Sequence, residues 1–428
     1  MLYPHALRYL NSLTSYEKIT NFSYKEAVKL ERIRNFLALI GNPQKSLSII
    51  HVAGSKGKGS TCAFIAYILR ESGFSVGLYT SPHLNDFRER IRILRPFTGT
   101  RRRITGDFEG MISQEEVTSL VRSLKPAINK YNRYSKYGPL TFFEAYTALA
   151  FIYFKDKRVD FVVLETGMGG ALDATNAADS LVQVITPVSY EHTDKLGATL
   201  AKIARQKAGI IKTKNSIVIL APQKKEALEV IQRRCKSVGA DLPLSVGMRQ
   251  IKLLKLKMSL IGRHQLVNAA SAIGAVKALR HYGINVLPQA IRRGVRNTRW
   301  PGRCEVIKNN PLIVLDGAQN LASARVLKKA IEDNFKYKKL ILVLGISQDK
   351  DICAICRTLG ILSHEIILTR AQTPRAADPK KLAAYFNRKL YLTKSVKEAK
   401  LLAVRLAHKE DLILVTGSLF VVGEFRNA

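Results

Sequence analysis

A glycine- and lysine-rich segment, Gly54-Ser55-Lys56-Gly57-Lys58-Gly59-Ser60, is the most informative stretch of the chain. Its glycines allow the backbone to approach a phosphate closely, and the free N–H groups at the start of a helix point toward such an anion. Lys58 offers positive charge to β- and γ-phosphates, and the hydroxyl of Ser60 can ligate the Mg²⁺ that accompanies them. Gly59 separates the two, whereas the strict nucleotide-loop pattern has lysine and serine adjacent. A Gly/Lys-rich surface turn is the alternative, but a strand-like run before the segment and a helical pattern after it favour a phosphate loop.

Further polar side chains stand where two other strands are predicted to end. Glu165 ends an apolar run and precedes a second glycine-rich turn, 166–170, while Tyr190-Glu191-His192-Thr193-Asp194 follows the run 181–186. Ligands of open parallel sheets gather at the carboxyl ends of the strands. A serine hydroxyl, a carboxylate and an imidazole meeting there suit a divalent cation near a triphosphate. Imidazole is atypical for Mg²⁺, so His192 taken alone is better explained as a hydrogen-bonding structural histidine.

The elements that must position these residues follow from hydrophobic periodicity. Apolar β-branched runs alternate with stretches of helical period, which is typical of parallel α/β units. In the first part we expect strands over 48–53, 75–80, 159–165, 181–186 and 216–220, and helices over 61–70, 142–154 and 200–208. In the last third we expect strands over 312–316, 340–344, 365–369 and 412–416, and helices over 322–334, 351–359, 379–386 and 396–407.

A Pro-Gly break inside Asn297–Arg303 separates these two blocks. At 428 residues the chain is long enough for two or three domains. We therefore predict an α/β protein with two domains. Residues 1–296 form a mostly parallel-sheet, nucleotide-binding N-terminal domain, and residues 297–428 form a smaller, Rossmann-like C-terminal α/β domain.

Composition narrows the class of protein. Apolar residues make up 46% of the chain, no apolar run is long enough to span a membrane, and the first residues lack a signal-peptide pattern, so we expect a cytoplasmic protein without membrane contact. The five cysteines are few and odd in number, which fits a reducing compartment. Cys353 and Cys356 form a lone CxxC, which is better explained as one helical face than as a redox or zinc site.

The formal net charge is unusually positive, with 69 basic and 33 acidic residues giving +36. Such a charge attracts anions and favours loose contact with nucleic acid. The basic residues are spread along the chain without a nucleic-acid recognition signature, and only residues 88–103 are dense in arginine. A solvated basic surface and an anionic small-molecule substrate explain this distribution more simply than specific nucleic-acid binding. The segment Arg95–Gly110, with three glycines and no apolar period, is predicted to be a mobile loop.

Together these segments resemble the folylpolyglutamate synthase and dihydrofolate synthase family of ATP-dependent amide ligases, relatives of the Mur ligases. The resemblance covers nearly the whole chain, in order. It rests on HVAGSKGKGST (51–61), SPHL (81–84), FFEAYTALAF (142–151), VVLETGMGGALDATN (162–176), EHTDKLG (191–197), QKAGIIK (206–212), GRHQLVNAASAI (262–273), WPGRCEVI (300–307), VLDGAQN (314–320), SQDKD (347–351) and TGSLFVVGE (416–424).

The resemblance implies roles for individual residues. Lys58, Lys207 and His192 are the expected catalytic residues, and Lys207 matches a lysine that the family carbamylates to help hold a second Mg²⁺. Ser60, Glu165 and His192 are the expected metal ligands. The residues expected to bind ATP are Gly57, Lys58, Gly59, Ser60, Asn268, Arg303 and Asp316. Those expected to receive the pterin substrate are Pro82, His83, Thr141, Phe142, Glu144, Leu172, Asp173 and Ala174.

Three departures from the family pattern bear on substrate choice. Gln319 replaces a usual histidine and cannot carry a charge or act as an acid, and Ala171 replaces a usual arginine. The basic segment Arg95–Gly110 is also longer than the family's usual turn. Neither substitution touches the phosphate loop or the expected metal ligands, so the resemblance still implies an active enzyme.

The implied reaction adds L-glutamate to 7,8-dihydropteroate and to the γ-carboxylate of reduced folates through an acyl phosphate, with ATP held between the two domains of a monomer. A monofunctional folylpolyglutamate synthase stays open. A Mur-type peptidoglycan ligase is disfavoured by SPHL, LDATN and the spacing of WPGR and DGAQN. The net charge taken alone suggests a nucleic-acid-binding protein, and the phosphate loop taken alone suggests a generic ATPase or GTPase.

Overall fold

The computed structural model describes residues 1–17, 19, 22–96, 108–245 and 256–428. Much of the predicted segment Arg95–Gly110 therefore lies outside the described residues. By their internal contacts the residues form two units. The first contains Met1–His83, Arg88–Ser259 and Leu266–Thr298, and the second contains Leu84–Phe87, Leu260–Gln265 and Arg299–Ala428. The predicted domain boundary after residue 296 does not include two short earlier segments, Leu84–Phe87 and Leu260–Gln265, which group with the second unit.

The first unit is built on a seven-stranded sheet in the order β3-β2-β4-β1-β5-β6-β7. All neighbours are parallel except β2 and β3, which are antiparallel. The central strands are apolar runs buried on both faces, as parallel strands covered by helices must be. The strands are β1 (Ile49–Ala53), β2 (Val76–Tyr79), β3 (Ile91–Leu94), β4 (Phe161–Glu165), β5 (Val182–Ile185), β6 (Ile217–Leu220) and β7 (Leu244–Ser245).

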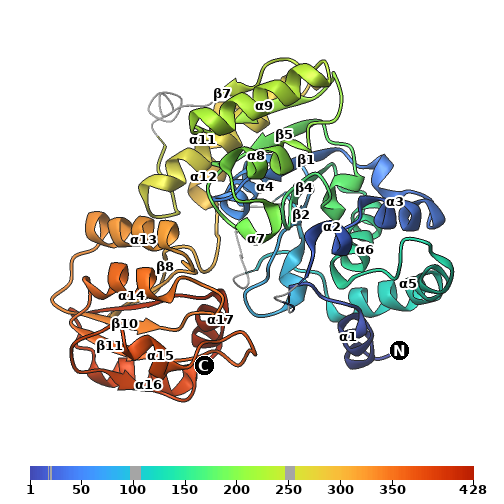
Figure 1. Ribbon diagram of the computed structural model, residues 1–428. Coiled ribbons are helices and arrows are strands. Elements are labelled where there is room, and N and C mark those ends of the chain that lie inside the picture. Colours follow the sequence, from blue (N-terminus) through green and yellow to red (C-terminus); the bar gives the residue numbers. More distant parts are fainter. Residues whose placement is uncertain (18, 20–21, 97–107, 246–255) are drawn as a thin grey trace. The chain divides into compact units, whose positions relative to one another are not determined.

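Helices cover this sheet, drawn from blue to yellow in Figure 1. Helix α4 contacts β1 to β4 and carries α12, while α6 packs with α1, α3 and α5, and α8 packs with α9. Serine and threonine caps with a glutamate three residues on begin α5 and α6. The helices are α1 (Tyr3–Ser12), α2 (Tyr24–Ala27), α3 (Leu30–Leu39), α4 (Lys58–Glu71), α5 (Gln114–Tyr134), α6 (Phe142–Asp156), α7 (Thr193–Leu196), α8 (Leu200–Ala208), α9 (Lys225–Ser237), α11 (Arg263–Ala278) and α12 (Pro288–Asn297), with short 3-10 turns η1 (Pro43–Ser46), η2 (Phe87–Arg90), η3 (Ala174–Ala177) and η4 (Leu279–Tyr282).

The second unit, orange to red in Figure 1, has a six-stranded sheet in the order β12-β11-β10-β13-β9-β8, parallel except for β8. Buried residues of α13, α14 and α15 join one face of the sheet in a single apolar core, while α16 and α17 pack together against its other face. The elements are β8 (Glu305–Asn309), β9 (Leu312–Leu315), α13 (Leu321–Asn334), β10 (Leu340–Leu344), α14 (Ile352–Gly360), β11 (Glu365–Leu368), α15 (Pro379–Ala383), β12 (Tyr391–Leu392), α16 (Val396–Leu406), β13 (Leu412–Thr416) and α17 (Leu419–Asn427).

These two α/β units confirm the predicted fold class. Every strand predicted from an apolar run is present, and helix α4 begins at Lys58, three residues before the expected start. Cys353 and Cys356 lie on α14 as the helical interpretation predicts, and no group of three or more His, Cys, Asp or Glu with metal-binding geometry occurs among the described residues. No helix in the described part of the chain has the length and apolarity that crossing a bilayer requires.

The interpretation of the arginine-dense segment as solvated surface is wrong for its first part. Arg90 and Arg92 are 1% and 0% exposed, because η2 and β3 turn their side chains into the first unit. Arg90 is bound at both of its terminal nitrogens by Glu17, at 2.7 and 2.6 Å. Arg92 donates from Nε to the carbonyl of Glu109 at 2.8 Å. Part of the positive charge is therefore structural and unavailable to ligands.

Candidate active site

The phosphate loop leaves the carboxyl end of β1, which lies between β4 and β5 where the strand order reverses direction. Gly54 has φ of 142°, and a Cβ there would lie 1.9 Å from Thr186 Oγ1. Gly57 has φ of 87° and caps α4, and its Cβ would lie 2.1 Å from Asn268 Oδ1. Glycine is thus required at both positions by backbone conformation and by space. The expected ATP residue Asn268 lies against the loop.

Three lysines, two in the loop and one beside it, lie close enough to the Glu191 carboxylate to interact with its charge. Lys207 Nζ donates to Glu191 Oε1 at 2.7 Å and to the carbonyl of Gly54 at 2.8 Å. Lys58 Nζ donates to the same carbonyl at 3.2 Å, and Lys56 Nζ lies 3.8 Å from Glu191 Oε2. This arrangement concentrates positive charge where a triphosphate would lie.

Burial and charge shift the titration of this cluster. Burial alone would raise the pKa of Glu191, but Lys207, then Lys58 and Lys56, lower it to about 2. Burial lowers the pKa of Lys207 to about 8, although Glu191 opposes the shift. Lys207 is 1% exposed, so its amine lies inside the first unit and is not part of the basic surface. An amine with this pKa carries an appreciable neutral fraction near neutrality.

The three expected metal ligands lie at adjoining strand ends. Ser60 is in the first turn of α4 and is 3% exposed, and Glu165 ends β4 and is 5% exposed. Register pairs Glu165 with Val52 of β1, and its charge helps burial to raise the pKa of Cys62 on α4. His192 has φ of 47° and precedes α7, beyond the end of β5.

Two members of this donor set, Ser60 and Glu165, fit Mg²⁺, whereas the imidazole of His192 is an atypical ligand for it. A hydroxyl and a carboxylate are hard oxygen donors of the kind Mg²⁺ prefers. Glu165 is held by a hydrogen bond from the Ser81 amide to its Oε2 at 3.2 Å, which orients the carboxylate at the strand end. Two of the three expected ligands are therefore nearly buried oxygen donors, one at the end of β4 and one on the helix that follows the adjacent strand β1.

The second glycine-rich turn, 166–170, is organised around Asp173. Its carboxylate accepts hydrogen bonds from the Met168 amide at 2.8 Å and from the Thr175 amide and hydroxyl at 3.1 and 2.6 Å. Burial raises the pKa of Asp173, and these donors oppose the shift. A Cβ at Gly167 would lie 3.2 Å from Asp173 Oδ2. The carboxylate thus fixes the turn that follows β4.

A buried histidine of β1 extends this network. His51 Nε2 lies 2.9 Å from Thr175 Oγ1 and 3.0 Å from Thr166 Oγ1. Since Thr175 donates its own proton to Asp173, its oxygen is free to accept one from His51. Burial, and next the charge of Lys212, lower the pKa of His51 to about 3. The imidazole is therefore neutral at physiological pH.

The remaining residues expected on the pterin side divide between the start of α6 and the loop after β2. Thr141 caps α6, and the Phe142 ring stacks on Tyr146 with centroids 5.5 Å apart. The Arg90 guanidinium lies 5.6 Å from the Phe142 centroid and donates from Nε to His83 Nδ1 at 3.0 Å. The Arg90 side chain therefore joins two of these residues. Of the others, Pro82 follows a cis peptide bond, Leu172 packs on the core of α8 and α9, and Ala174 begins η3.

Glu144 and Ala171 both form hydrogen bonds to other residues of the protein. The Glu144 carboxylate is 4% exposed and is bound by Arg32 and Thr141. The amide of Ala171 donates to Gln206 O at 2.8 Å, and a Cβ on Gly209 would lie 2.4 Å from that of Ala171. The substitution of arginine by alanine therefore stands beside the end of α8, next to Lys207.

In the second unit, Asp316 and Arg303 are neighbours. Asp316 accepts from the Cys304 and Ala318 amides, each at 2.8 Å, and burial raises its pKa while Arg303 opposes the rise. Burial, and next the charge of Arg303, lower the pKa of His264 in the same unit to about 4. Gln319 is exposed, and its amide donates to Ser323 Oγ at 3.1 Å.

Comparison with known proteins identifies the family. Residues 115–276 match the Mur ligase middle domain, and residues 302–419 match the Mur ligase glutamate ligase domain. The chain is 34% identical to the dihydrofolate synthase/folylpolyglutamate synthase of Bacillus subtilis, over 93% of this chain and 94% of that protein. The chain belongs to the folylpolyglutamate synthase/dihydrofolate synthase family.

Two further relatives extend this comparison. The chain is 37% identical to a probable bifunctional folylpolyglutamate synthase/dihydropteroate synthase of Haloferax volcanii, over 92% of this chain but only 48% of that protein, so it spans about half the length of that relative. The Escherichia coli FolC structure in complex with DHPP and ADP superimposes with a TM-score of 0.83 at 28% identity, covering 100% of this chain and 97% of that one. The expected family and ligase class are confirmed.

No role was predicted from the sequence for three polar residues that the structure places in or near the site, namely Glu191, His51 and Arg32. Glu191 and His51 stand inside matched motifs, so a search for buried ionisable residues within those motifs could have singled them out. Arg32 stands in none, and its partner Glu144 is 112 residues away. A charged residue within the apolar pattern of α3, whose Ile33, Phe36 and Leu37 are buried, is the only sequence signal.

Proposed function

We propose that the protein adds L-glutamate to dihydropteroate, giving dihydrofolate, and to the γ-carboxylate of reduced folates, giving polyglutamates. The observation that carries the proposal is the similarity, over more than nine-tenths of both chains, to a relative named for both activities. A solved relative of the same fold was crystallised with DHPP and ADP. The mainly cationic surroundings of the phosphate loop suit ATP and an anionic acid substrate.

The reaction requires that a carboxylate acquire a better leaving group. The carboxylate oxygen attacks the γ-phosphorus of ATP, the bond to the β,γ-bridging oxygen breaks, and ADP leaves. The amine of L-glutamate then attacks the acyl carbon of the acyl phosphate. The tetrahedral intermediate expels inorganic phosphate, and the nitrogen releases a proton to give the amide. Positioning and charge neutralisation are the protein's main contributions to such transfers.

The phosphate loop supplies both contributions. The amides at the start of α4 and the Lys58 ammonium would hold the β- and γ-phosphates, with Gly57, Gly59 and Ser60 completing the cradle. Ser60, Glu165 and His192 would hold Mg²⁺, which offsets phosphate charge when bound. Asn268, which lies against Gly57, and Arg303 and Asp316 of the second unit are assigned to ATP by their family positions.

Lys207 is proposed to react with CO₂ as the neutral amine. The nitrogen forms a bond to carbon and loses a proton, so an ammonium is replaced by a carbamate anion, which would help to hold a second Mg²⁺. The buried setting that lowers the Lys207 pKa to about 8 favours this chemistry. Glu191, which pairs with the ammonium, would then face an anion, and Lys56 and Lys58 offer replacement counter-charges.

The acid substrate is assigned to the residues around the second glycine turn and the start of α6: Pro82, His83, Thr141, Phe142, Leu172, Asp173 and Ala174. Glu144 is assigned to the same region, with its carboxylate held by Arg32 and Thr141. We also propose a cytoplasmic monomer that binds neither membranes nor specific nucleic acid. The five cysteines are all free, in keeping with a reducing compartment.

The test is ADP release by the purified protein with Mg-ATP and L-glutamate, with either dihydropteroate or tetrahydrofolate as acceptor. Turnover of both acceptors is expected. Turnover of tetrahydrofolate alone would restrict the protein to polyglutamate synthesis. No turnover of either, despite ATP binding, would overturn the proposal and direct attention to Gln319 and Ala171.

A further inference from the structure

A buried ion pair stands at the start of helix α6. Arg32 Nε lies 2.9 and 2.8 Å from the two carboxylate oxygens of Glu144, and the two side chains are 6% and 5% exposed. Glu144 Oε2 also accepts from the Thr141 amide and hydroxyl, each at 2.8 Å, and the Glu144 amide donates back to Thr141 Oγ1 at 3.2 Å. Both oxygens of Glu144 are thus occupied within the protein.

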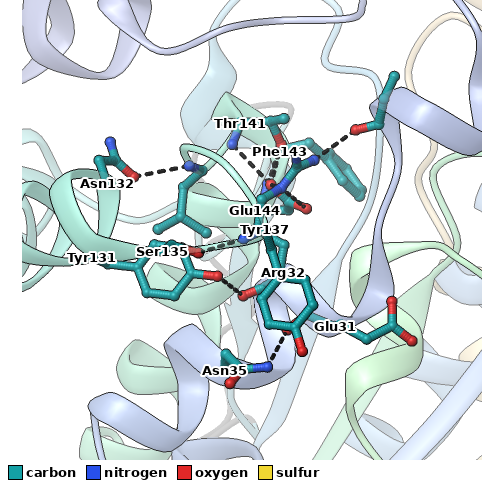
Figure 2. Close-up of polar contacts among 12 residues, drawn as sticks. Glu31, Arg32, Asn35, Tyr131, Asn132, Ser135, Tyr137, Thr141, Phe143 and Glu144 are labelled. Carbon is teal, nitrogen blue, oxygen red and sulfur yellow. Dashed lines mark hydrogen bonds and ion pairs between the residues drawn. The ribbon is translucent and has the colours of Figure 1, made fainter.

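The pair joins segments that are remote in sequence, as Figure 2 shows. Arg32 Nη2 donates to the carbonyl of Ala27, the last residue of α2, at 2.6 Å. The Tyr131 hydroxyl of α5 donates to the Arg32 carbonyl at 2.8 Å. Removing either charged partner would therefore leave a buried charge and loosen the start of α6.

Each residue of the pair is linked to the second glycine-rich turn, 166–170, through a neighbouring residue. Next to Glu144, the ring of Phe143 covers Gly167 so closely that a Cβ there would lie 2.6 Å from Phe143 Cζ. On the Arg32 side, Ala27 ends α2, and Tyr24 of α2 donates from its hydroxyl to the Met168 carbonyl at 3.2 Å. The pair is thus connected to the turn that Asp173 organises along two separate routes.

We infer that Arg32 and Glu144 are positioning residues for the heterocyclic end of the acid substrate, acting through the start of α6 and the 166–170 turn. The inference rests on the proposed function. Glu144 stands at a position that the family resemblance assigns to substrate binding, but its two oxygens meet four protein contacts and it is 4% exposed. Its effect on the substrate is therefore indirect. Arg32 binds Glu144 through Nε and the Ala27 carbonyl through Nη2, so one rigid guanidinium group fixes two segments relative to each other.

The experiment compares Arg32→Lys and Glu144→Gln with one control variant at another buried arginine that forms ion pairs. Arg70→Lys is the control, because the Arg70 side chain is 0% exposed and bridges Glu109 at 2.7 Å and Glu71 at 3.1 Å, at the end of α4 away from the phosphate loop. Arg32→Lys keeps the charge but loses the fork that reaches Glu144 and Ala27 together. Glu144→Gln keeps the shape and removes the charge.

We expect KM for dihydropteroate to rise about tenfold in Arg32→Lys and Glu144→Gln, with KM for ATP and L-glutamate within twofold of wild type. Arg70→Lys should leave all three constants within twofold. A rise in KM for ATP parallel to that for dihydropteroate, or equal changes in Arg70→Lys, would reduce the pair to a general structural role and overturn the inference.

A second readout separates this inference from the proposed function. Hydrogen exchange of the peptide covering residues 165–175, measured without substrates, should be at least fivefold faster in both variants and unchanged in Arg70→Lys. Unchanged exchange overturns the inference even if the wild type is fully active. Absence of wild-type turnover with faster exchange in the variants would contradict the proposed function alone. If both variants fail to fold, Tyr24→Phe removes one route only, and it must accelerate exchange of the same peptide for the inference to stand.

Discussion

Two glycine-rich turns leave adjacent strands of the first unit and use similar backbone devices in opposite electrostatic settings. The turn after β1 contains Gly54 and Gly57 at φ of 142° and 87°, and the turn after β4 contains Gly169 and Gly170 at 71° and 158°. Three lysines and one glutamate surround the first, whereas a buried aspartate holds the second. Backbone shape alone therefore does not decide what such a turn binds.

The difference lies in which groups each turn presents and which it uses to hold itself together. The first turn offers N–H groups and ammonium groups, which suit phosphate oxygens. The second is organised by acceptors, namely the Asp173 carboxylate and the hydroxyls of Thr166 and Thr175, with His51 kept neutral between them. A triphosphate suits the first turn, whereas the acceptors of the second are at most 3% exposed and are used within the protein to hold the turn in shape.

The largest test of this contrast is Lys58→Ala. It removes the ammonium that starts α4, and turnover measured by ADP release should fall roughly 10²–10³-fold, as for loss of one group that stabilises developing charge. Lys56→Ala is the matched control in the same loop. The Lys56 side chain is 34% exposed and 3.8 Å from Glu191, so its removal should cost less than about threefold. Equal losses in the two variants would contradict a specific role for Lys58.

The neutral histidine beneath the second turn gives a pH test. The His51 pKa is lowered from 6.5 to about 3, so between these values the unfolded chain binds more protons and stability falls as pH falls. From pH 7 to pH 5 this group should cost about 2 kcal/mol of unfolding free energy, roughly 30-fold in the equilibrium constant. His51→Gln should lose that part of the dependence. Urea unfolding at both pH values measures it, and identical pH dependence in the two proteins would refute the assignment.

Asp173→Asn tests the acceptor character of the second turn. The amide keeps the size but turns a donor toward the Met168 or Thr175 N–H, leaving two donors face to face. KM for dihydropteroate should rise about tenfold, with KM for ATP unchanged in steady-state assays. Asp179→Asn is the control, since that side chain is 90% exposed beside Lys212. A change in KM for ATP would show that the two turns are not separate.

Glu191→Gln tests the cationic setting of the first turn, and its expected effect, on the titration of Lys207, is the smallest of the four. Without Glu191 the pKa of Lys207 should move below about 8, because the attraction that opposes burial is gone. Each half unit of lowering raises the ratio of neutral to charged amine roughly threefold. Carbamate occupancy, followed by the carbon resonance in ¹³C-bicarbonate, should rise accordingly. A fall in occupancy would mean that Glu191 promotes the modification.

Sequence patterns predict the interior of both sheets but none of their edges. Strands such as β1 and β13 are apolar at four of their five positions because helices cover both faces. The four strands without a prediction, β3, β7, β8 and β12, all lie at sheet edges, where strands are short or carry polar residues. Arg90 and Arg92, beside and within β3, also made a buried segment resemble a surface.

The candidate site divides in the same way. Residues in local motifs, such as Lys58 and Asp173, could be predicted because the chemistry depends on their spacing in the sequence. The Arg32–Glu144 pair could not, because the partners are 112 residues apart and, although the capping box of α6 accounts for Glu144, nothing in α3 requires an arginine. The cluster of lysines on Glu191 likewise depends on β5 lying beside β1, which follows only from the sheet order.

The position of β1 has a consequence for how the chain is made. Both neighbours of this strand come late, since Ile49 pairs with Val162 and Ile50 pairs with Val182. At ribosomal speeds of about 5–20 residues per second, β1 waits on the order of 10 s before either neighbour emerges. During that interval a strand with four apolar residues out of five is exposed to other nascent chains, so the same central placement that surrounds the phosphate loop in the finished protein leaves this strand unpaired during synthesis.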